Sequence, residues 1–253
     1  MTDVLIEKYS DCSNIPNYEL FQTGDILLFS DREFIPSILI EEMTHSKYSH
    51  VGIILRDPKF PHESLEGLYI LESTGYIKVK DVENHKYKVG VQINKLSDVY
   101  NITEGNIYWR RLTTDRDTDF DQIISEVHKL THDKGYDFDP GDWVKAYFDW
   151  HIGNEQKENE FICSALVAFL YDRLGFLTKP VEWTIVRPVD WGTEYPESER
   201  RVHIDNCVLD PEIQIRFFDD KKDDDDNQND KTSSYWSYLY APFDMIRNYF
   251  SRD

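Results

Sequence analysis

The chain has 253 residues, 40% of them hydrophobic and 14% aromatic, which suits one substantial domain with its own core. Its formal charge is −20, from 28 basic and 48 acidic residues, so it lacks the basic excess with which proteins bind nucleic acids or anionic lipid. The three cysteines are too scattered for a disulfide framework, and neither a signal peptide nor an apolar run of about 18 residues is present, so we expect a cytoplasmic protein without a transmembrane segment.

The first half of the chain is rich in predicted strands. Residues 1–20 have a mixed composition and are expected to form an N-terminal arm, and residues 34–43 carry apolar side chains at helical spacing. Short apolar runs bounded by glycine or polar residues are typical of strands. These runs are residues 23–29, 48–55, 65–74, 75–82, 88–96 and 106–112.

The second half contains the strongest predicted helices. Residues 118–132 have the pattern of an amphipathic helix, and residues 158–176 form the most apolar helix, with Gly175 as a plausible C-cap. The segments 184–191 and 207–218 are expected to be short extended pieces. Antiparallel-looking strands with helices before and after them indicate an α+β fold.

The sequence divides into four segments, of which residues 21–218 form the main domain and 1–20 the arm. Residues 219–234 include the acidic run DDKKDDDDNQND and are expected to be a disordered linker. Residues 235–253 carry aromatic and apolar side chains at near-helical spacing, which suits docking on a protein partner or on a membrane surface. Three basic and two acidic residues in 231–253 give this end a charge of +1, which offers little attraction to anionic lipid.

The strand predicted at 48–55, YSHVGIIL, contains two residues that a buried strand does not need. His50 at its start is either a core residue with satisfied hydrogen bonds or a chemically active group. Gly52 weakens a strand unless something approaches the backbone closely. This strand alone leaves both interpretations of His50 open.

Cys163 lies near the start of the most apolar predicted helix. A helix N-terminus favours a thiolate, and its unpaired N–H groups can receive a developing oxyanion. Most free cysteines are nevertheless small buried hydrophobic residues. Cys12 and Cys207 lie in polar, loop-like contexts with no helix start beside them.

A thiol nucleophile needs a base, and the base needs an orienting partner. In the strand LYILEST, alternation places Leu68, Ile70 and Glu72 on one face. A carboxylate in this position is costly to bury without a partner, and Glu72 would serve as an acceptor for the His50 ring. The alternative is an edge glutamate that points into solvent.

The sequence predicts neither a metal site nor a cofactor site. His128 and His132 have helical spacing but lack the glutamate of the HExxH pattern, and we expect them on an exposed helix face. The acidic run that begins at Asp137 lacks the glycine and the glutamate that a calcium loop requires at its sixth and twelfth positions. No glycine loop for nucleotides and no GxSxG elbow is present.

The order of these motifs resembles the circularly permuted NlpC-type papain-like hydrolases. This group includes bacterial permuted amidases and proteins of poxviruses and other large DNA viruses, and it is related to the lecithin:retinol acyltransferase-like enzymes. The resemblance covers residues 22–192, and in permuted members, as here, the histidine strand precedes the cysteine helix. The matching motifs are Gly24-Asp25-Ile26, Ser49-His50-Val51-Gly52-Ile53, an isolated Glu72, Tyr136-Asp137 and Cys163-Ser164-Ala165-Leu166-Val167.

The resemblance implies a permuted papain-like fold, with a small antiparallel sheet or barrel packed against the helix that bears the nucleophile. It implies Cys163 as nucleophile, His50 as general base and Glu72 as the orienting residue, with no cofactor. Further residues would serve as pocket or scaffold: Asp25, Tyr48, Gly52 and Tyr136. The chain departs from many bacterial members at Ala165, where a polar residue is usual, and at Arg187-Pro188-Val189-Asp190, where the others have Pro-Asp.

Two functions are therefore expected as alternatives. The first is a thiol hydrolase or acyltransferase that acts on an amide, ester or thioester of a small molecule, lipid or peptide through a covalent acyl-enzyme. The second is a catalytically silent binding or structural protein, for example of a virion or a host-interaction complex. If the protein is viral, its place would be the host cytoplasm or the virion.

Overall fold

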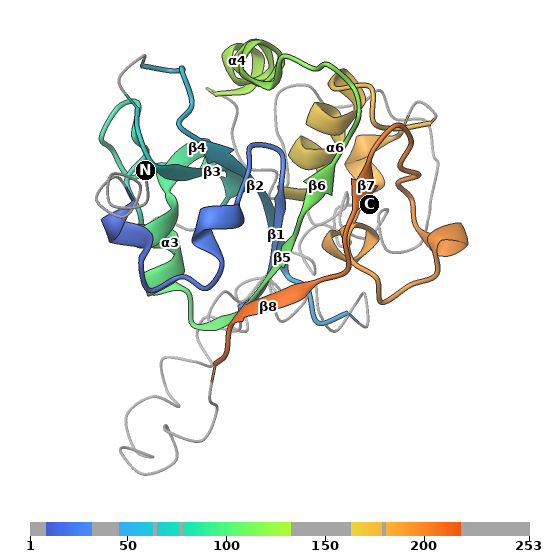
Figure 1. Ribbon diagram of the computed structural model, residues 1–253, viewed down its shortest axis with the longest axis horizontal. Coiled ribbons are helices and arrows are strands. Elements are labelled where there is room, and N and C mark those ends of the chain that lie inside the picture. Colours follow the sequence, from blue (N-terminus) through green and yellow to red (C-terminus); the bar gives the residue numbers. More distant parts are fainter. Residues whose placement is uncertain are drawn as a thin grey trace, which may run out of the picture.

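The computed structural model describes residues 9–31, 46–62, 65–75, 78–132, 163–178 and 181–218, apart from the side chains of Asp31 and Thr184 (Figure 1). The fold is mixed α and β, built on a mostly antiparallel six-stranded sheet with helices on both sides. The predicted helix at 34–43, the linker at 219–234 and the segment at 235–253 lie outside the described residues.

The described strands and α-helices, in chain order, are β1 (Ile26–Asp31), β2 (His50–Arg56), β3 (Leu68–Thr74), β4 (Gly90–Lys95), α3 (Leu96–Ile102), β5 (Gly105–Arg110), β6 (Leu112–Thr113), α4 (Phe120–Thr131), α6 (Cys163–Arg173), β7 (Val208–Leu209) and β8 (Ile213–Arg216). The 3-10 helices are η1 (Ser10–Cys12), η2 (Tyr18–Leu20), η3 (Trp183–Ile185), η4 (Pro188–Trp191) and η5 (Glu197–Glu199).

The sheet is open, with strand order β4-β3-β2-β1-β5-β8, and its neighbouring strands pair antiparallel. Within it Phe29 lies opposite His50, and Glu72 lies opposite Gln92. Because β2 begins at the end of the sheet where β3 finishes, His50 and Glu72 come to the same end. A second, two-stranded sheet pairs β6 with β7.

Each face of the sheet has its own hydrophobic core. Val51, Ile53 and Leu55 of β2 face the cluster that contains α6 and part of α4. Ile54 faces the opposite cluster, which contains the N-terminal turns and α3. Figure 1 shows α6 and α3 on these two sides. The period of two along the strands decides which core each side chain joins.

Most predicted strands are confirmed, but the one at 75–82 is wrong. In the described part of this segment, residues 78–82 form bends and a turn. Asp81 is fully buried, and its carboxylate accepts hydrogen bonds from the backbone N–H groups of Ile93 (2.9 Å) and Asn84 (3.4 Å). Such side-chain bonds to the backbone stabilise a turn in place of a sheet ladder.

Two further expectations also need correction. The described part of the expected arm packs against the sheet, where Cys12, Ile15 and Tyr18 are buried. Residues 184–191, expected to be extended, instead form the 3-10 helices η3 and η4 over most of their length.

Asp25 ties the first strand to the rest of the domain. Its carboxylate is fully buried and accepts hydrogen bonds from three N–H donors, those of the Gln22 backbone (2.9 Å), the Trp109 indole (2.8 Å) and the Leu112 backbone (2.9 Å). Burial raises the pKa of this carboxyl, and the three hydrogen bonds partly oppose the rise.

We expect the Asp25→Ala variant to lose about 3 kcal/mol or more of unfolding free energy, because three buried donors lose their acceptor. Denaturant unfolding of the full chain measures this loss. Asp117→Ala removes the same charge from an exposed position and serves as the matched control. Equal unfolding midpoints for the two variants would contradict this account.

Candidate active site

The imidazole of His50 is bound to a buried carboxylate at one end of the sheet. His50 Nε2 lies 2.6 Å from Glu72 Oε2, and the exposed fractions of the two side chains are 19% and 5%. Alternation places Glu72 on the face of β3 shared by Leu68 and Ile70, as the sequence predicts. Glu72 therefore does not point into solvent.

The second oxygen of this carboxylate is also bound. Asn94 Nδ2 donates a hydrogen bond of 2.8 Å to Glu72 Oε1. Two donors on two oxygens offset much of the cost of burying the carboxylate. They also hold the plane of the Glu72 carboxylate, so that Oε2 stays directed at the His50 ring.

Cys163 lies on the other side of the histidine. It is the first residue of α6 in the described chain, is 2% exposed, and lies close enough to His50 to raise the pKa of the imidazole. Because Glu72 occupies Nε2, Nδ1 is the ring nitrogen left for the sulfur. The structure thus brings His50, Glu72 and Cys163 together, although 91 residues separate Glu72 from Cys163 in the sequence.

His50 stands where the two cores meet. Its ring lies 5.2 Å from that of Phe29, a residue of the α3-side core, and it also contacts Cys163, which belongs to the α6-side core. A residue in the middle of a strand would reach only one face of the sheet. As the first residue of β2, His50 can contact residues from both faces.

The surroundings favour the charged form of His50. Burial alone would lower its pKa, but the charge and hydrogen bond of Cys163 and those of Glu72 outweigh this effect and raise the pKa to about 10. The imidazole is therefore protonated at neutral pH and places a positive charge beside the Cys163 sulfur.

Gly52 makes room for a neighbouring strand and not for α6 or a substrate. A Cβ atom built on it would lie 2.6 Å from Ile70 Cδ1 and 3.3 Å from Glu72 Cβ. The missing side chain thus lets Ile70 and Glu72 lie over β2. Gly52 acts as scaffold under the His50–Glu72 pair.

The other predicted site residues are scaffold or fall outside the described residues. Asp25 binds three N–H groups at the opposite end of β1 from Phe29, away from His50. Tyr48 is fully buried, donates a hydrogen bond of 3.0 Å to Glu212 and packs edge-on against Tyr108. Tyr136 lies outside the described residues.

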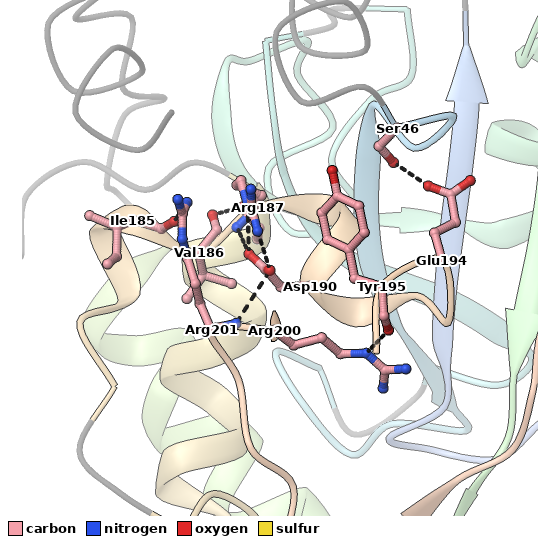
Figure 2. A network of polar contacts seen from close by, with 10 residues as sticks. Ser46, Ile185, Val186, Arg187, Asp190, Glu194, Tyr195, Arg200 and Arg201 are labelled. Carbon is pink, nitrogen blue, oxygen red and sulfur yellow. Dashed lines mark hydrogen bonds and ion pairs between the residues drawn. The ribbon is translucent and has the colours of Figure 1, made fainter. Parts of the chain in front are cut away.

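The segment after α6 is fixed against the helix start by hydrogen bonds. Ser164 Oγ donates to the backbone carbonyl of Val186 at 2.6 Å. The guanidinium of Arg187 binds both oxygens of the buried Asp190, which also accepts from the backbone N–H of Arg201 (Figure 2). The segment Arg187-Pro188-Val189-Asp190 lies within this network.

The same segment also fixes the residues that precede β2. Ser46 Oγ donates to Glu194 at 2.8 Å, as Figure 2 shows, and accepts from the backbone N–H of Tyr48 at 3.0 Å. The approach to His50 and the start of α6 are therefore held by one connected set of contacts.

The other two cysteines have no comparable surroundings. Cys12 is fully buried, contrary to the loop-like context expected for it, and burial together with the Asp11 carboxylate raises its pKa to about 12. Burial and Asp205 raise the pKa of Cys207 to about 12 as well.

The sequence suggested an exposed helix face for His128, but the structure buries this residue. It is 3% exposed, and its Nε2 lies 3.1 Å from Glu83 Oε2. Burial lowers the pKa of this histidine, although Glu83 partly opposes the effect. In the described ranges, no three side chains of His, Cys, Asp or Glu form a group that would hold a metal ion.

Asn94 is the functional candidate that sequence reasoning missed. The segment Val91-Gln92-Ile93-Asn94 alternates apolar and polar residues, and its apolar pair faces the α6-side core. This alternation was the available signal. The sequence does not show that Asn94 binds Glu72, because this contact depends on the pairing of β3 with β4.

Comparison with known proteins yields one informative likeness. No protein-family model matches the chain. An uncharacterized protein of Acanthamoeba polyphaga mimivirus is 33% identical over 145 residues, which are 51% of this chain and 53% of the mimivirus protein. The chain spans about half the length of this relative, whose name assigns no activity.

None of the helices in the described part of the chain has the length and the hydropathy of a membrane span.

We expect Gly52→Ala to destabilise the protein by about 1–3 kcal/mol, because the added methyl group overlaps Ile70. In the Ile70→Ala background this extra loss should vanish, since the clashing atoms are gone. Unfolding free energies of the two single variants and the double variant measure the coupling. Additive losses would mean that Ile70 does not fill the space above Gly52.

The raised pKa of His50 makes its contribution to stability depend on pH. A group whose pKa is higher in the folded state stabilises the fold below its ordinary value of about 6.5 and loses this effect as the pH rises to about 10. We therefore expect the stability of the parent relative to His50→Gln to fall between pH 6.5 and 10, by at most about 1.4 kcal/mol per pH unit. Denaturant unfolding of both chains across this range measures this fall in stability. A stability difference that does not change with pH would contradict the raised pKa of His50.

Proposed function

We propose that the protein is a thiol hydrolase or acyltransferase with Cys163 as nucleophile, His50 as general base and Glu72 as the residue that orients the histidine. The observation that carries the proposal is the position of His50, which interacts with the Cys163 sulfur while its Nε2 is bound to the Glu72 carboxylate. A nucleophile, a base and an orienting group in this order are the recurring components of covalent acyl transfer.

The charge state of the site supports this role. With His50 protonated, the imidazolium places a positive charge beside the Cys163 sulfur, and such a neighbour favours the nucleophilic form of a cysteine in general. Glu72 stabilises the imidazolium. Cys12 and Cys207 lack a histidine partner, and their raised pKa keeps them as thiols at neutral pH.

The reaction follows from these positions. The Cys163 sulfur attacks the carbonyl carbon of an amide, ester or thioester, and the carbonyl oxygen becomes an oxyanion near the first N–H groups of α6. As the intermediate collapses, the bond to the leaving group breaks and His50 gives its proton to that group. Water or a second acceptor then attacks the thioester and returns a proton to His50, which releases the thiolate.

The order of histidine strand, glutamate strand and cysteine helix also supports the finer fold assignment, a permuted papain-like domain over residues 21–218. The antiparallel sheet and the packing of α6 on β2 and β3 agree with that architecture. The likeness to a mimivirus protein agrees with the viral part of the resemblance and assigns no substrate.

Alkylation of the three cysteines tests the proposal. We expect iodoacetamide at pH 7 to label Cys163 faster than Cys12 and Cys207, as measured by peptide mass spectrometry, because only Cys163 has an imidazolium beside it. In His50→Ala this preference should disappear, while the slow rates of the other two cysteines stay unchanged and serve as internal controls.

Acyl transfer itself is tested with p-nitrophenyl acetate. The parent chain should release p-nitrophenol in a burst and gain one acetyl group on Cys163, and Cys163→Ser should give neither. Loss of either His50 or Glu72 should slow acylation by about 10²–10⁴-fold, the usual range for general-base assistance. Equal labelling of all three cysteines together with no acylation would leave the silent binding protein as the better account.

A further inference from the structure

Two amide side chains are buried on one face of the edge strand β4. Gln92 and Asn94 are 0% and 1% exposed, and they point away from the core that Val91 and Ile93 join. Burying an amide without hydrogen bonds costs about 1–3 kcal/mol in proteins. Asparagine is also disfavoured in strands. This part of β4 therefore gives up stability that apolar residues would supply.

The two amides differ in what they bind. Asn94 Nδ2 donates to Glu72 Oε1 at 2.8 Å, within a fully buried pair. Gln92 Nε2 approaches only the backbone carbonyl of Lys88, at 3.5 Å, which is the limit for a hydrogen bond. The side-chain oxygens of both amides lack a hydrogen-bond partner among the described residues. Only Asn94 is linked to the candidate active site.

We propose that Asn94 is a positioning residue of the active site, which fixes the Glu72 carboxylate and through it the His50 ring. This inference rests on the proposed function and deepens it by adding a fourth residue to the chain Cys163–His50–Glu72. Asn94 touches neither the sulfur nor the imidazole in the described contacts and acts through Glu72 alone.

The geometry explains why Glu72 needs such a partner. A glutamate carboxylate turns about a broad, weakly restricted terminal torsion. The Asn94 donor holds Oε1, so that Oε2 remains 2.6 Å from His50 Nε2. Gly52 leaves the space above β2 in which Ile70 and the Cβ atom of Glu72 lie. The position and the plane of the Glu72 carboxylate are thus set by residues of β2 and β4, the two strands beside β3.

The same bond stabilises the charge of Glu72. With the carboxylate side chain 5% exposed, water contributes little to its solvation, and the Asn94 N–H supplies part of what is lost. Without this donor the carboxylate can turn away from the ring, and the His50 imidazolium loses part of its support. Asn94 therefore acts on the protonation of His50 without contacting it.

Asn94→Leu and Gln92→Met form a matched pair for testing this role. Both replace a buried amide of β4 with an apolar side chain of similar size, and both remove an oxygen without a partner. Only the first removes a hydrogen bond to Glu72. Unfolding midpoints show whether each full-length variant folds, and Asn94→Ser, whose hydroxyl is too short to reach Glu72, replaces Asn94→Leu if that variant does not.

The readout is the pH titration of His50 followed by NMR of the ring nitrogens, in full-length chains that carry Cys163→Ala. This background removes the sulfur, so that the titration reports the support from Glu72. We expect Asn94→Leu to weaken proton binding by His50 about tenfold, because a carboxylate free to turn makes a weaker hydrogen bond to the imidazolium, and a hydrogen bond to a charged group is worth about this much. Gln92→Met should leave the titration unchanged.

The outcomes separate this inference from the proposed function. An unchanged His50 titration in Asn94→Leu, or equal shifts in both variants, would overturn the positioning role. A shift in Asn94→Leu alone supports it. If that shift occurs while Cys163 of the otherwise unchanged chain labels no faster than the other cysteines, the positioning of His50 stands and the thiol enzyme fails.

Discussion

One buried carboxylate, that of Glu72, organises this end of the sheet. An ionised carboxylate that is 5% exposed persists only if hydrogen-bond donors replace the water it has lost. His50 supplies one donor and Asn94 the other, from the strands on either side of β3. Gly52 supplies the space, because any side chain there would overlap Ile70. The histidine is consequently oriented and charged by its contacts within the fold.

The rest of the fold keeps the cysteine helix within reach of that histidine. The apolar residues of α6 pack against one core, and Ser164 binds the backbone of the following segment. The ion pair of Arg187 with Asp190 stabilises that segment in turn. Because His50 begins its strand, it reaches both cores and meets Cys163 at a boundary of the sheet, where a side chain can be partly exposed.

The errors of the sequence-based predictions share one physical cause. Residues 75–82 have the composition of a strand, yet the buried Asp81 binds backbone N–H groups and stabilises a turn. The exposed helix face expected for His128 is covered, since Glu83 reaches it from a segment 45 residues earlier. Gly52 was expected to admit the helix or a substrate, and instead admits Ile70. In each case a deciding partner lies outside the stretch of chain on which the prediction was based.

The sequence by itself determined the strands of the sheet, the apolar helix α6 and the face of β3 on which Glu72 lies. These features depend on periodicity and composition within a short stretch of chain, which neighbouring residues control. Only the tertiary structure decided that Glu72 binds His50 on one side and Asn94 on the other. Such pairings depend on strand order and register, which are set only when the whole sheet packs against its two cores.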